Sequence, residues 1–217
     1  MSNELVQGVK DSGIKEITPA VENKNFSVEF KKAMAGSRVE MCFLTGVTMI
    51  LNHSPAIVEM LRRNVKVHLL FSDITSPIWD TEKEEKFINI SEGLCPGTPV
   101  KHNALWALNL VSKDILNLLS EEERSNLEIG LSTAIVTAHC VILHNVNNEN
   151  ICYYTPYLPH THSQKSARFA FSEKEKLGFS LIAQSFHEMW ENRLKVKIEG
   201  KEAEVIEYSD AAGTPVR

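Results

Sequence analysis

The chain has 217 residues, of which 43% are hydrophobic and 24% are charged. These values exclude a mainly disordered chain, a collagen and a coiled-coil rod. The formal net charge is −5, so general nucleic-acid binding, which needs clustered Lys and Arg, is not expected. No apolar run reaches the ~20 residues that a membrane span needs. The first residues also lack a signal-peptide pattern, and both features favour a cytoplasmic protein.

The first half of the chain predicts a strand–helix–strand unit. Residues 1–26 are polar, and we expect a tail or a loosely docked arm, followed by a short helix over residues 27–36. The apolar run at residues 38–45 indicates a buried strand. A helix is then predicted to begin at Ser54 and Pro55, because Ser caps helices well and Pro fits the first helical position. Residues 65–71 form the next strand, which a helical crossover makes parallel to the first.

The second half predicts two further helices and a hairpin. A long connection, residues 72–99, precedes a helix at residues 100–122, where apolar side chains recur every three or four positions. Those side chains are Leu105, Leu108, Val111, Ile115 and Leu118. Residues 126–133 form a strand, and an Asn-rich turn joins two more, residues 136–145 and 151–154, into a hairpin. A final helix is expected at residues 173–194, with the apolar stripe Phe179, Ile182, Phe186 and Met189.

These elements predict one α/β domain, a mixed sheet flanked by helices, over residues 27–198. The segment 199–217 is rich in acids, and we expect a solvated tail. The four cysteines are widely spaced with no CxxC, which favours free buried thiols over a zinc site. The sequence has no GxxxxGK[ST], GxGxxG or GxSxG motif, and no cofactor or metal is predicted.

The carboxyl ends of the two parallel strands form the predicted ligand-binding edge, because open α/β sheets bind ligands there. The polar groups at this edge belong to Thr45, Ser72 and Asp73, and Gly46 lets the backbone approach a ligand closely. The loop after the hairpin could close over the same edge. It supplies Tyr157, His160, His162, Lys165 and Arg168. Arg and Lys there suit an anionic ligand; the alternative is that Tyr157 packs and the other side chains are solvated.

His139 lies on an otherwise apolar strand face, which leaves two interpretations. A His in this setting is usually a core residue with one hydrogen bond, and the other interpretation is a catalytic His. His68 has the same two interpretations.

Several segments resemble phospholipase-D-like domains. RVEMCFLTGV, followed by a helix and LRRNVKVHLLFSD, is similar to the opening strand, helix and strand of that family. VTAHCVILHNVNNENICYYTPYLP is similar to the paired strands that carry its HxKxxxxD motif, and FSLIAQSFHEMWENR to its closing helix. The resemblance covers residues 36–194 and is closest to bacterial members that lack the motif.

The resemblance implies a degenerate active site. If His139 stands for the nucleophilic His of the family, the Lys position is Val141 and the Asp position is Val146, with Asn145 one residue early. Cleavage of a phosphate ester needs a nucleophile together with cationic stabilisation of the phosphate oxygens. The sequence therefore favours a domain without catalysis.

Three functions remain open at this level. The first is binding or sensing of a phosphorylated small molecule such as a nucleotide. The second is a protein-interaction or scaffolding module. The third is a phosphodiesterase or nuclease acting as a homodimer, since the family pairs two motifs in one site.

Overall fold

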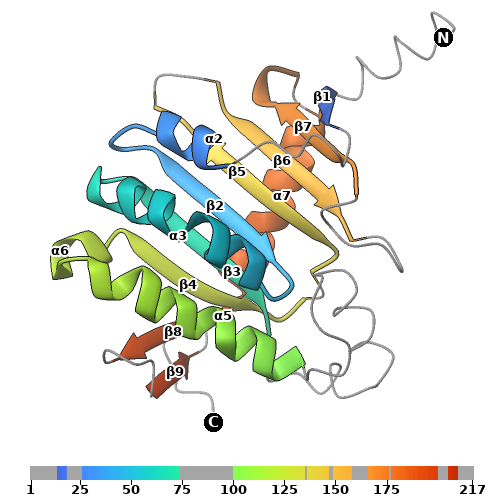
Figure 1. Cartoon of the computed structure of the whole chain (residues 1–217). Coiled ribbons are helices and arrows are strands. Elements are labelled where there is room, and N and C mark those ends of the chain that lie inside the picture. The colour runs from blue at the N-terminus through green and yellow to red at the C-terminus, as the bar shows by residue number, and fades with distance from the viewer. Residues whose placement is uncertain are drawn as a thin grey trace, which may run out of the picture.

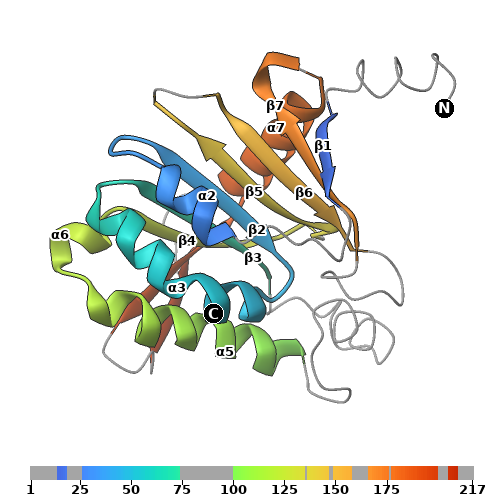
Figure 2. The same cartoon turned by 45° about the horizontal axis from the view of Figure 1, so that its top comes forward.

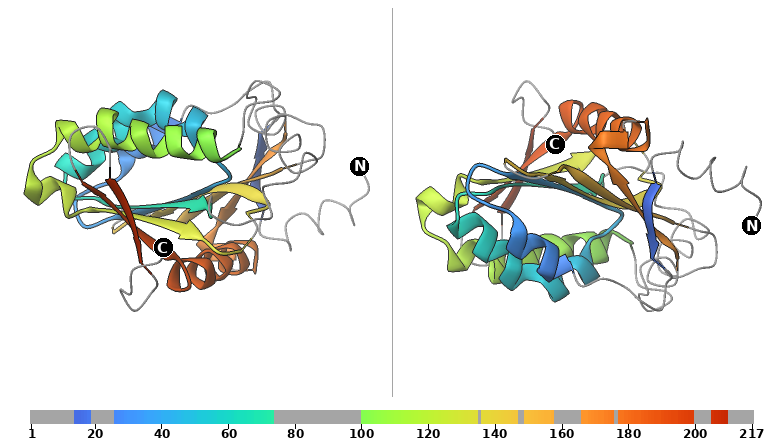
Figure 3. Two further views of the ribbon diagram at one scale, coloured as in Figure 1. Left: turned by 90° about the horizontal axis from the view of Figure 1, so that it is seen from below. Right: turned by 90° about the horizontal axis from the view of Figure 1, so that it is seen from above.

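The structure is a computed structural model that describes residues 14–18, 26–73, 100–134, 136–146, 149–157, 166–175, 177–199 and 205–209. A nine-stranded mixed sheet with the order β1-β7-β6-β5-β2-β3-β4-β8-β9 runs through these residues. Helices α2 (Phe26–Lys32), α3 (Val47–Arg62) and α5 (Val100–Asp114) cover one face, and α7 (Leu177–Glu191) covers the other (Figures 1 and 3). The predicted α/β class is confirmed.

The centre of the sheet is parallel. Strand β2 (Arg38–Phe43) pairs in parallel with β3 (Lys66–Ser72), which pairs in parallel with β4 (Leu127–Ser132). Both faces of these strands are buried, one under α3 and α5 and one under α7, so their sequences are nearly continuous apolar runs rather than alternating ones. The predicted strand–helix–strand unit is confirmed.

The other half of the sheet is antiparallel. The predicted hairpin is formed by β5 (Ala138–His144) and β6 (Ile151–Pro156), and β5 joins the sheet beside β2. Strand β7 (Arg168–Ser172) follows beside β6. Because β5 runs antiparallel to β2, the amino end of β5 lies at the same edge of the sheet as the carboxyl ends of β2 and β3.

Helix α3 begins earlier than the sequence predicts. Its first residue is Val47 and Pro55 lies inside it, so Ser54 and Pro55 do not start the helix. A proline inside a helix costs about 3 kcal/mol because it removes one hydrogen bond and crowds the preceding turn. Residues before and after the proline, among them Ile50 and Ile57, are fully buried. Burial on both sides of Pro55 offsets the cost and keeps the helix continuous.

The helix predicted at residues 100–122 is divided into three. It comprises α5, a 3-10 turn η3 (Leu116–Leu118) and the short α6 (Glu121–Arg124), which Ser120 and Glu123 start with a reciprocal capping box. Leu118 is therefore 54% exposed instead of buried. The final helix is also shorter than predicted: a 3-10 turn η5 (Glu173–Glu175) precedes α7. None of the described helices combines the length and the apolar character needed to cross a bilayer.

Both outer edges of the sheet come from segments for which the sequence predicted no strand. Strand β1 (Ile14–Thr18) pairs antiparallel with β7 (Figure 2). At the opposite edge, β8 (Leu194–Glu199) pairs with β4, and β9 (Val205–Ser209) pairs with β8. The sheet thus extends into both predicted tails. These strands contain charged residues between their apolar ones, because an outer strand needs only one apolar face. They therefore lack the continuous apolar run by which the central strands are predicted.

Candidate functional site

The predicted ligand-binding residues at the carboxyl ends of β2 and β3 lie close together. The backbone N–H of Ser72 donates to the carbonyl of Leu44 over 3.2 Å, and that of Asp73 donates to Ser132 over 2.9 Å. Thr45 and Ser72 are buried, and within the described ranges neither hydroxyl has a hydrogen-bond partner. Buried hydroxyls without a partner cost free energy, which makes this edge suited to a ligand that supplies one.

Gly46 forms the connection from β2 to α3 in a conformation that other residues rarely adopt. Its φ is 73°, in the left-handed region. A Cβ atom at this position would lie 2.6 Å from Cε1 of Phe71 and 3.1 Å from Cδ2 of Phe43. The glycine allows this turn to pack directly on two aromatic rings beneath the edge.

A cluster of two histidines, one arginine and two aromatic residues lies beside this edge, on the sheet face that α2 covers. We call it the histidine–arginine cluster, and it consists of His139, Arg168, His53, Tyr153 and Phe26. Phe26, the first residue of α2, packs at the centre: its ring centroid is 5.7 Å from that of His139, 5.9 Å from that of His53 and 5.6 Å from that of Tyr153. The guanidinium carbon of Arg168 stands 4.2 Å above the same ring.

Five elements position these side chains, and α2 contributes Phe26. His139 is near the start of β5, where its ring also packs 5.3 Å from Phe43 of β2. Arg168 begins β7 and is only 8% exposed. His53 comes from α3 and Tyr153 from β6. The cluster therefore forms only when the sheet, α2 and α3 have assembled.

Burial and mutual repulsion keep both histidines neutral. Burial, followed by the positive charges of Arg168 and His53, lowers the pKa of His139 to about 3. Burial and the charge of Arg168 lower the pKa of His53 to about 4. Burial also lowers the pKa of Arg168 itself, yet its guanidinium stays charged at neutral pH. The cluster thus contains one buried cation and two histidines whose lowered pKa values keep them neutral at neutral pH.

Burial and the neighbouring carboxylate of Glu29 raise the pKa of Tyr153, so its hydroxyl keeps its proton. The one proton of this phenol is directed to the carboxylate of Glu29.

The cationic partner that a phospholipase-D-type nucleophile requires is missing from the position that the resemblance indicates. Val141 is fully buried in the apolar core under α3. Val146 is 58% exposed, and Asn145 holds the turn between β5 and β6 by donating to the carbonyl of Glu149 over 3.1 Å. His139 is therefore not accompanied by a Lys on its own strand.

The predicted loop residues are not all brought to this cluster. Tyr157 packs on the opposite face of the sheet, under α7, where its hydroxyl accepts from the backbone N–H of Leu44 over 3.2 Å. His160, His162 and Lys165 lie outside the described residues. Among the described residues of the loop set, Arg168 belongs to the histidine–arginine cluster and Tyr157 does not.

Sequence reasoning missed His53, Tyr153 and Phe26. The predicted start of this helix at Ser54 left His53 outside any element, although its position one turn before Ile57 shows that it follows the same helical period. Tyr153 and Thr155 are alternate residues of β6, so their side chains point to the same face of the sheet, and both are buried. In the described part of the chain, no three His, Cys, Asp or Glu side chains are arranged to hold a metal ion.

A second polar network lies on the α7 face, near the amino ends of β2 and β3. Glu40 is 7% exposed, and its carboxylate accepts from Nε2 of His144 over 2.7 Å and from Nε of Arg38 over 3.0 Å. His68 stands 3.7 Å from the same carboxylate and stacks on Trp190 of α7 at 4.4 Å. Burial alone would raise the pKa of Glu40, but these partners outweigh it and lower the pKa to about 2.

A cavity of about 380 Å³ lies between α7 and the strands β5 and β6, and Cys42 and Cys140 are among the residues that line it. These two cysteines and Cys152 are buried free thiols, as predicted, and Cys95 lies outside the described residues. The hydrogen bond with Cys140, and then burial, raise the pKa of the Cys42 thiol, and burial raises the pKa of the Cys152 thiol. The thiols of Cys42 and Cys152 are therefore protonated packing groups rather than nucleophiles.

No protein-family model matches the sequence, and no curated protein matches it. Among solved structures, the chain is similar to Nuc, a phospholipase D family member from Salmonella typhimurium, at 11% identity and a TM-score of 0.45, over 82% of this chain and 93% of that one. It is also similar to TrmBL2, an archaeal chromatin protein whose structure shows a mode of DNA binding, at 12% identity and a TM-score of 0.44. That match covers 88% of this chain and 59% of TrmBL2. Both similarities are distant and concern the fold alone.

Proposed function

We propose that this chain is a phospholipase-D-like domain that binds a phosphorylated small molecule, such as a nucleotide, without cleaving it. The observation that carries the proposal is the histidine–arginine cluster, in which Arg168 is buried beside two neutral histidines at the ligand-binding edge. A phosphate group there would receive charge-assisted hydrogen bonds from Arg168. The hydroxyl of Thr45 would contribute a further donor at the same edge.

The expectation that the chain does not cleave the ligand rests on the side chain at position 141. A phosphoryl-transfer site needs cations aimed at the oxygens on which charge develops. Val141 cannot supply one, and it is buried among apolar neighbours. Arg168 and His139 can hold a phosphate, but the described residues place no ammonium group next to His139 on its strand.

Calorimetric titration with inorganic phosphate and with a nucleoside monophosphate tests this proposal. We expect Arg168→Met to weaken binding by about 10-fold to 100-fold, because a hydrogen bond to a charged group contributes ~1.5–3 kcal/mol. The matched control is Lys113→Met, which removes an exposed cation from α5, distant in the fold from β7. Equal affinity in the two variants, or no binding by the unmodified chain, would contradict the proposal.

The pH dependence of anion binding provides a separate test. Sulfate is the suitable probe because its charge is constant between about pH 7 and about pH 5. A bound anion raises the pKa values of His139 and His53 from about 3 and about 4 toward the assay pH. Binding then takes up protons, so we expect sulfate affinity to rise as the pH falls across this range.

The double variant His53→Gln/His139→Gln removes both titrating groups and is expected to bind sulfate with a nearly constant affinity over the same range. A pH dependence that persists in this variant would show that other groups take up the protons. Arg168 and Tyr153 pack with the histidines around Phe26, and both stay protonated over the range.

A second candidate function is protein interaction through α7. Leu177 and Leu181 are 58% and 60% exposed, and they lie one turn apart beside the cavity under this helix. Exposed apolar side chains next to a hollow are typical of interaction surfaces. Sedimentation velocity over a range of chain concentrations would reveal self-association through this surface.

A further inference from the structure

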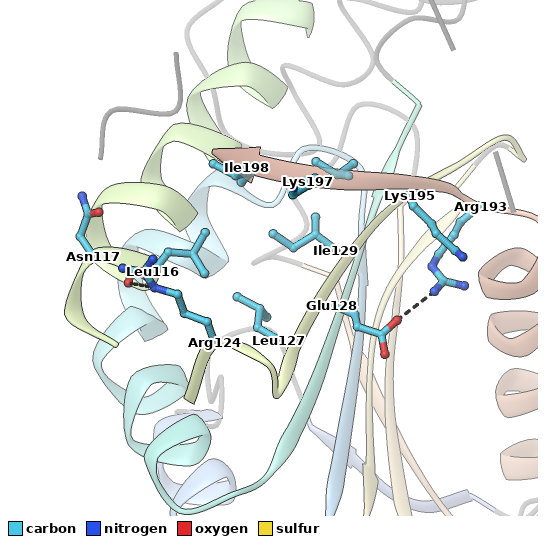
Figure 4. A pocket seen from close by; sticks show the side chains of 11 residues that line it. Leu116, Asn117, Arg124, Leu127, Glu128, Ile129, Arg193, Lys195, Lys197 and Ile198 are labelled. Atoms are coloured by element: carbon cyan, nitrogen blue, oxygen red, sulfur yellow. Dashed lines mark hydrogen bonds and ion pairs between the residues drawn. The ribbon is translucent and has the colours of Figure 1, made fainter. Parts of the chain in front are cut away.

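A second cavity lies far from the histidine–arginine cluster, where the β8–β9 hairpin separates from the rest of the sheet. Strand β8 pairs with β4 only through Leu194, Lys195 and Val196, while it continues alongside β9 to Glu199. The amino end of β4 and the carboxyl end of β8 therefore diverge. The space between them and the η3–α6 corner has a volume of about 510 Å³ (Figure 4), within the range of small-molecule sites.

One part of the cavity wall is apolar. Leu127 and Ile129 of β4 point into the space beneath β8, as Figure 4 shows. Leu116 of η3 and Val196 and Ile198 of β8 complete this wall, and all three are only partly buried. The wall thus leaves apolar surface accessible to a ligand with a hydrocarbon or aromatic body, whose burial against it is favourable.

The rest of the lining is strongly basic, although the whole chain is acidic. It contains four cations, Arg124, Arg193, Lys195 and Lys197, against the single carboxylate of Glu128. Lys195 and Arg193 lie at one end of the space and Arg124 lies at the other (Figure 4). Arg124 is held in place because its Nε donates to the carbonyl of Leu116 over 2.9 Å.

Arg193 is the most buried of these cations and still has an unused donor. It is 8% exposed, stacks 3.8 Å above the ring of Trp190, and donates to the carbonyl of Trp190 over 2.6 Å. Its other terminal nitrogen donates to Glu128 over 3.0 Å. Its Nε is buried and has no hydrogen-bond partner in the ranges that the structure describes. Gly130 makes room for this side chain, since a Cβ there would lie 2.4 Å from Cδ of Arg193.

From these contacts we infer that the cavity between β4, β8 and the η3–α6 corner binds an organic anion with an apolar body, such as a medium-chain carboxylate. The apolar body lies against Leu127, Ile129 and Ile198, and the anionic group lies at the end that carries Lys195 and Arg193. An apolar wall with a few convergent charged groups is the usual composition of such a site. No residue of the histidine–arginine cluster lines this cavity, so the inference does not depend on the proposed function.

Fluorescence titration of the full chain with 8-anilinonaphthalene-1-sulfonate tests this inference, because the probe combines an anion with an apolar body. We expect saturable binding that octanoate displaces. Sulfate, which has only the charge, and octanol, which has only the apolar chain, are expected to displace the probe at least tenfold less effectively. Displacement by sulfate or by octanol as effective as by octanoate would overturn the inference.

Charge variants assign the probe to this cavity. Lys195→Gln/Lys197→Gln changes two exposed residues and is expected to weaken binding of the probe and of octanoate about threefold to tenfold. Lys31→Gln/Lys113→Gln makes the same charge change on α2 and α5 and is the matched control. Equal affinities in the two double variants would show that the probe binds elsewhere, for example in the cavity under α7.

A variant with the opposite expected sign completes the test. Glu128→Gln removes the one carboxylate of the lining and releases a terminal nitrogen of Arg193, so octanoate is expected to bind about threefold more tightly. Arg168→Met is expected to leave octanoate binding unchanged. Weaker octanoate binding in Glu128→Gln would contradict the assigned anion position, and weaker binding in Arg168→Met would contradict the separation of the two sites.

Discussion

Replacement of Glu40 by Gln is expected to lower the free energy of unfolding by about 3 kcal/mol at neutral pH. The carboxylate is 7% exposed and holds His144, His68 and Arg38 around it. A neutral amide accepts these hydrogen bonds more weakly, and the stabilisation of the carboxylate that lowers its pKa from 4.5 to about 2 is lost. Urea denaturation of the two proteins at about pH 7 measures the difference.

The pH dependence of this difference has a definite sign. The pKa of Glu40 is about 2 in the folded chain, against an ordinary value of 4.5. The folded state therefore gains stability from the carboxylate above about pH 4.5, and this gain is lost as the pH falls toward about 2. We expect the unmodified chain and Glu40→Gln to converge in stability as the medium becomes acidic. A difference that stays constant over this range would contradict the network as the cause, and Glu122→Gln, on the exposed surface of α6, is the control.

Gly46→Ala is expected to destabilise the chain by about 3 kcal/mol, through two effects. An alanine in the left-handed region costs ~1–2 kcal/mol relative to glycine, and overpacking against a rigid neighbour adds ~1–3 kcal/mol. The new Cβ would meet the buried rings of Phe71 and Phe43 at 2.6 and 3.1 Å. Thermal denaturation followed by circular dichroism measures the loss.

Gly36→Ala is the matched control for this substitution. Gly36 also has a positive φ, 82°, but a Cβ there would lie 3.4 Å from Cγ2 of the exposed Val146, which is ordinary contact. The control is expected to lose only the backbone contribution, about 1–2 kcal/mol. Equal losses in the two variants would mean that the rings of Phe71 and Phe43 yield without cost. Since Phe43 also packs on His139, Gly46→Ala is further expected to weaken phosphate binding.

The sequence predicts the central strands better than the outer strands and the ends of the helices. Strands β2, β3 and β5 appear as short apolar runs because both of their faces are buried. The predicted start of α3 is wrong because Ser54 and Pro55 carry a strong local signal for the start of a helix. The actual start depends on the packing of Val47 and Ile50. Strands β1 and β9 were missed because an edge strand is stabilised by pairing with a distant neighbour, which local pattern does not reveal.

For the candidate site, too, the sequence indicates single residues but not which distant residues they contact. Sequence reasoning located Arg168 and His139 on separate elements but could not bring them together with His53 or Phe26, because their proximity depends on how α2 and α3 pack on the sheet. Tyr157 was associated with Arg168 because they flank one loop, yet they lie on opposite faces of the sheet. The polar network around Glu40 could have been predicted from the sequence, since a carboxylate within an apolar strand requires buried partners.

The pairing of β1 with β7 has a consequence for the order of events during synthesis. Ile14–Thr18 leaves the ribosome long before Arg168–Ser172, whereas β8 and β9 are neighbours in the chain and can join as soon as both have been made. A nascent chain therefore displays the β1 segment while its own partner does not yet exist. Crowded nascent copies could exchange this segment with one another, so the amino-terminal edge is where intertwined assemblies of this domain would originate.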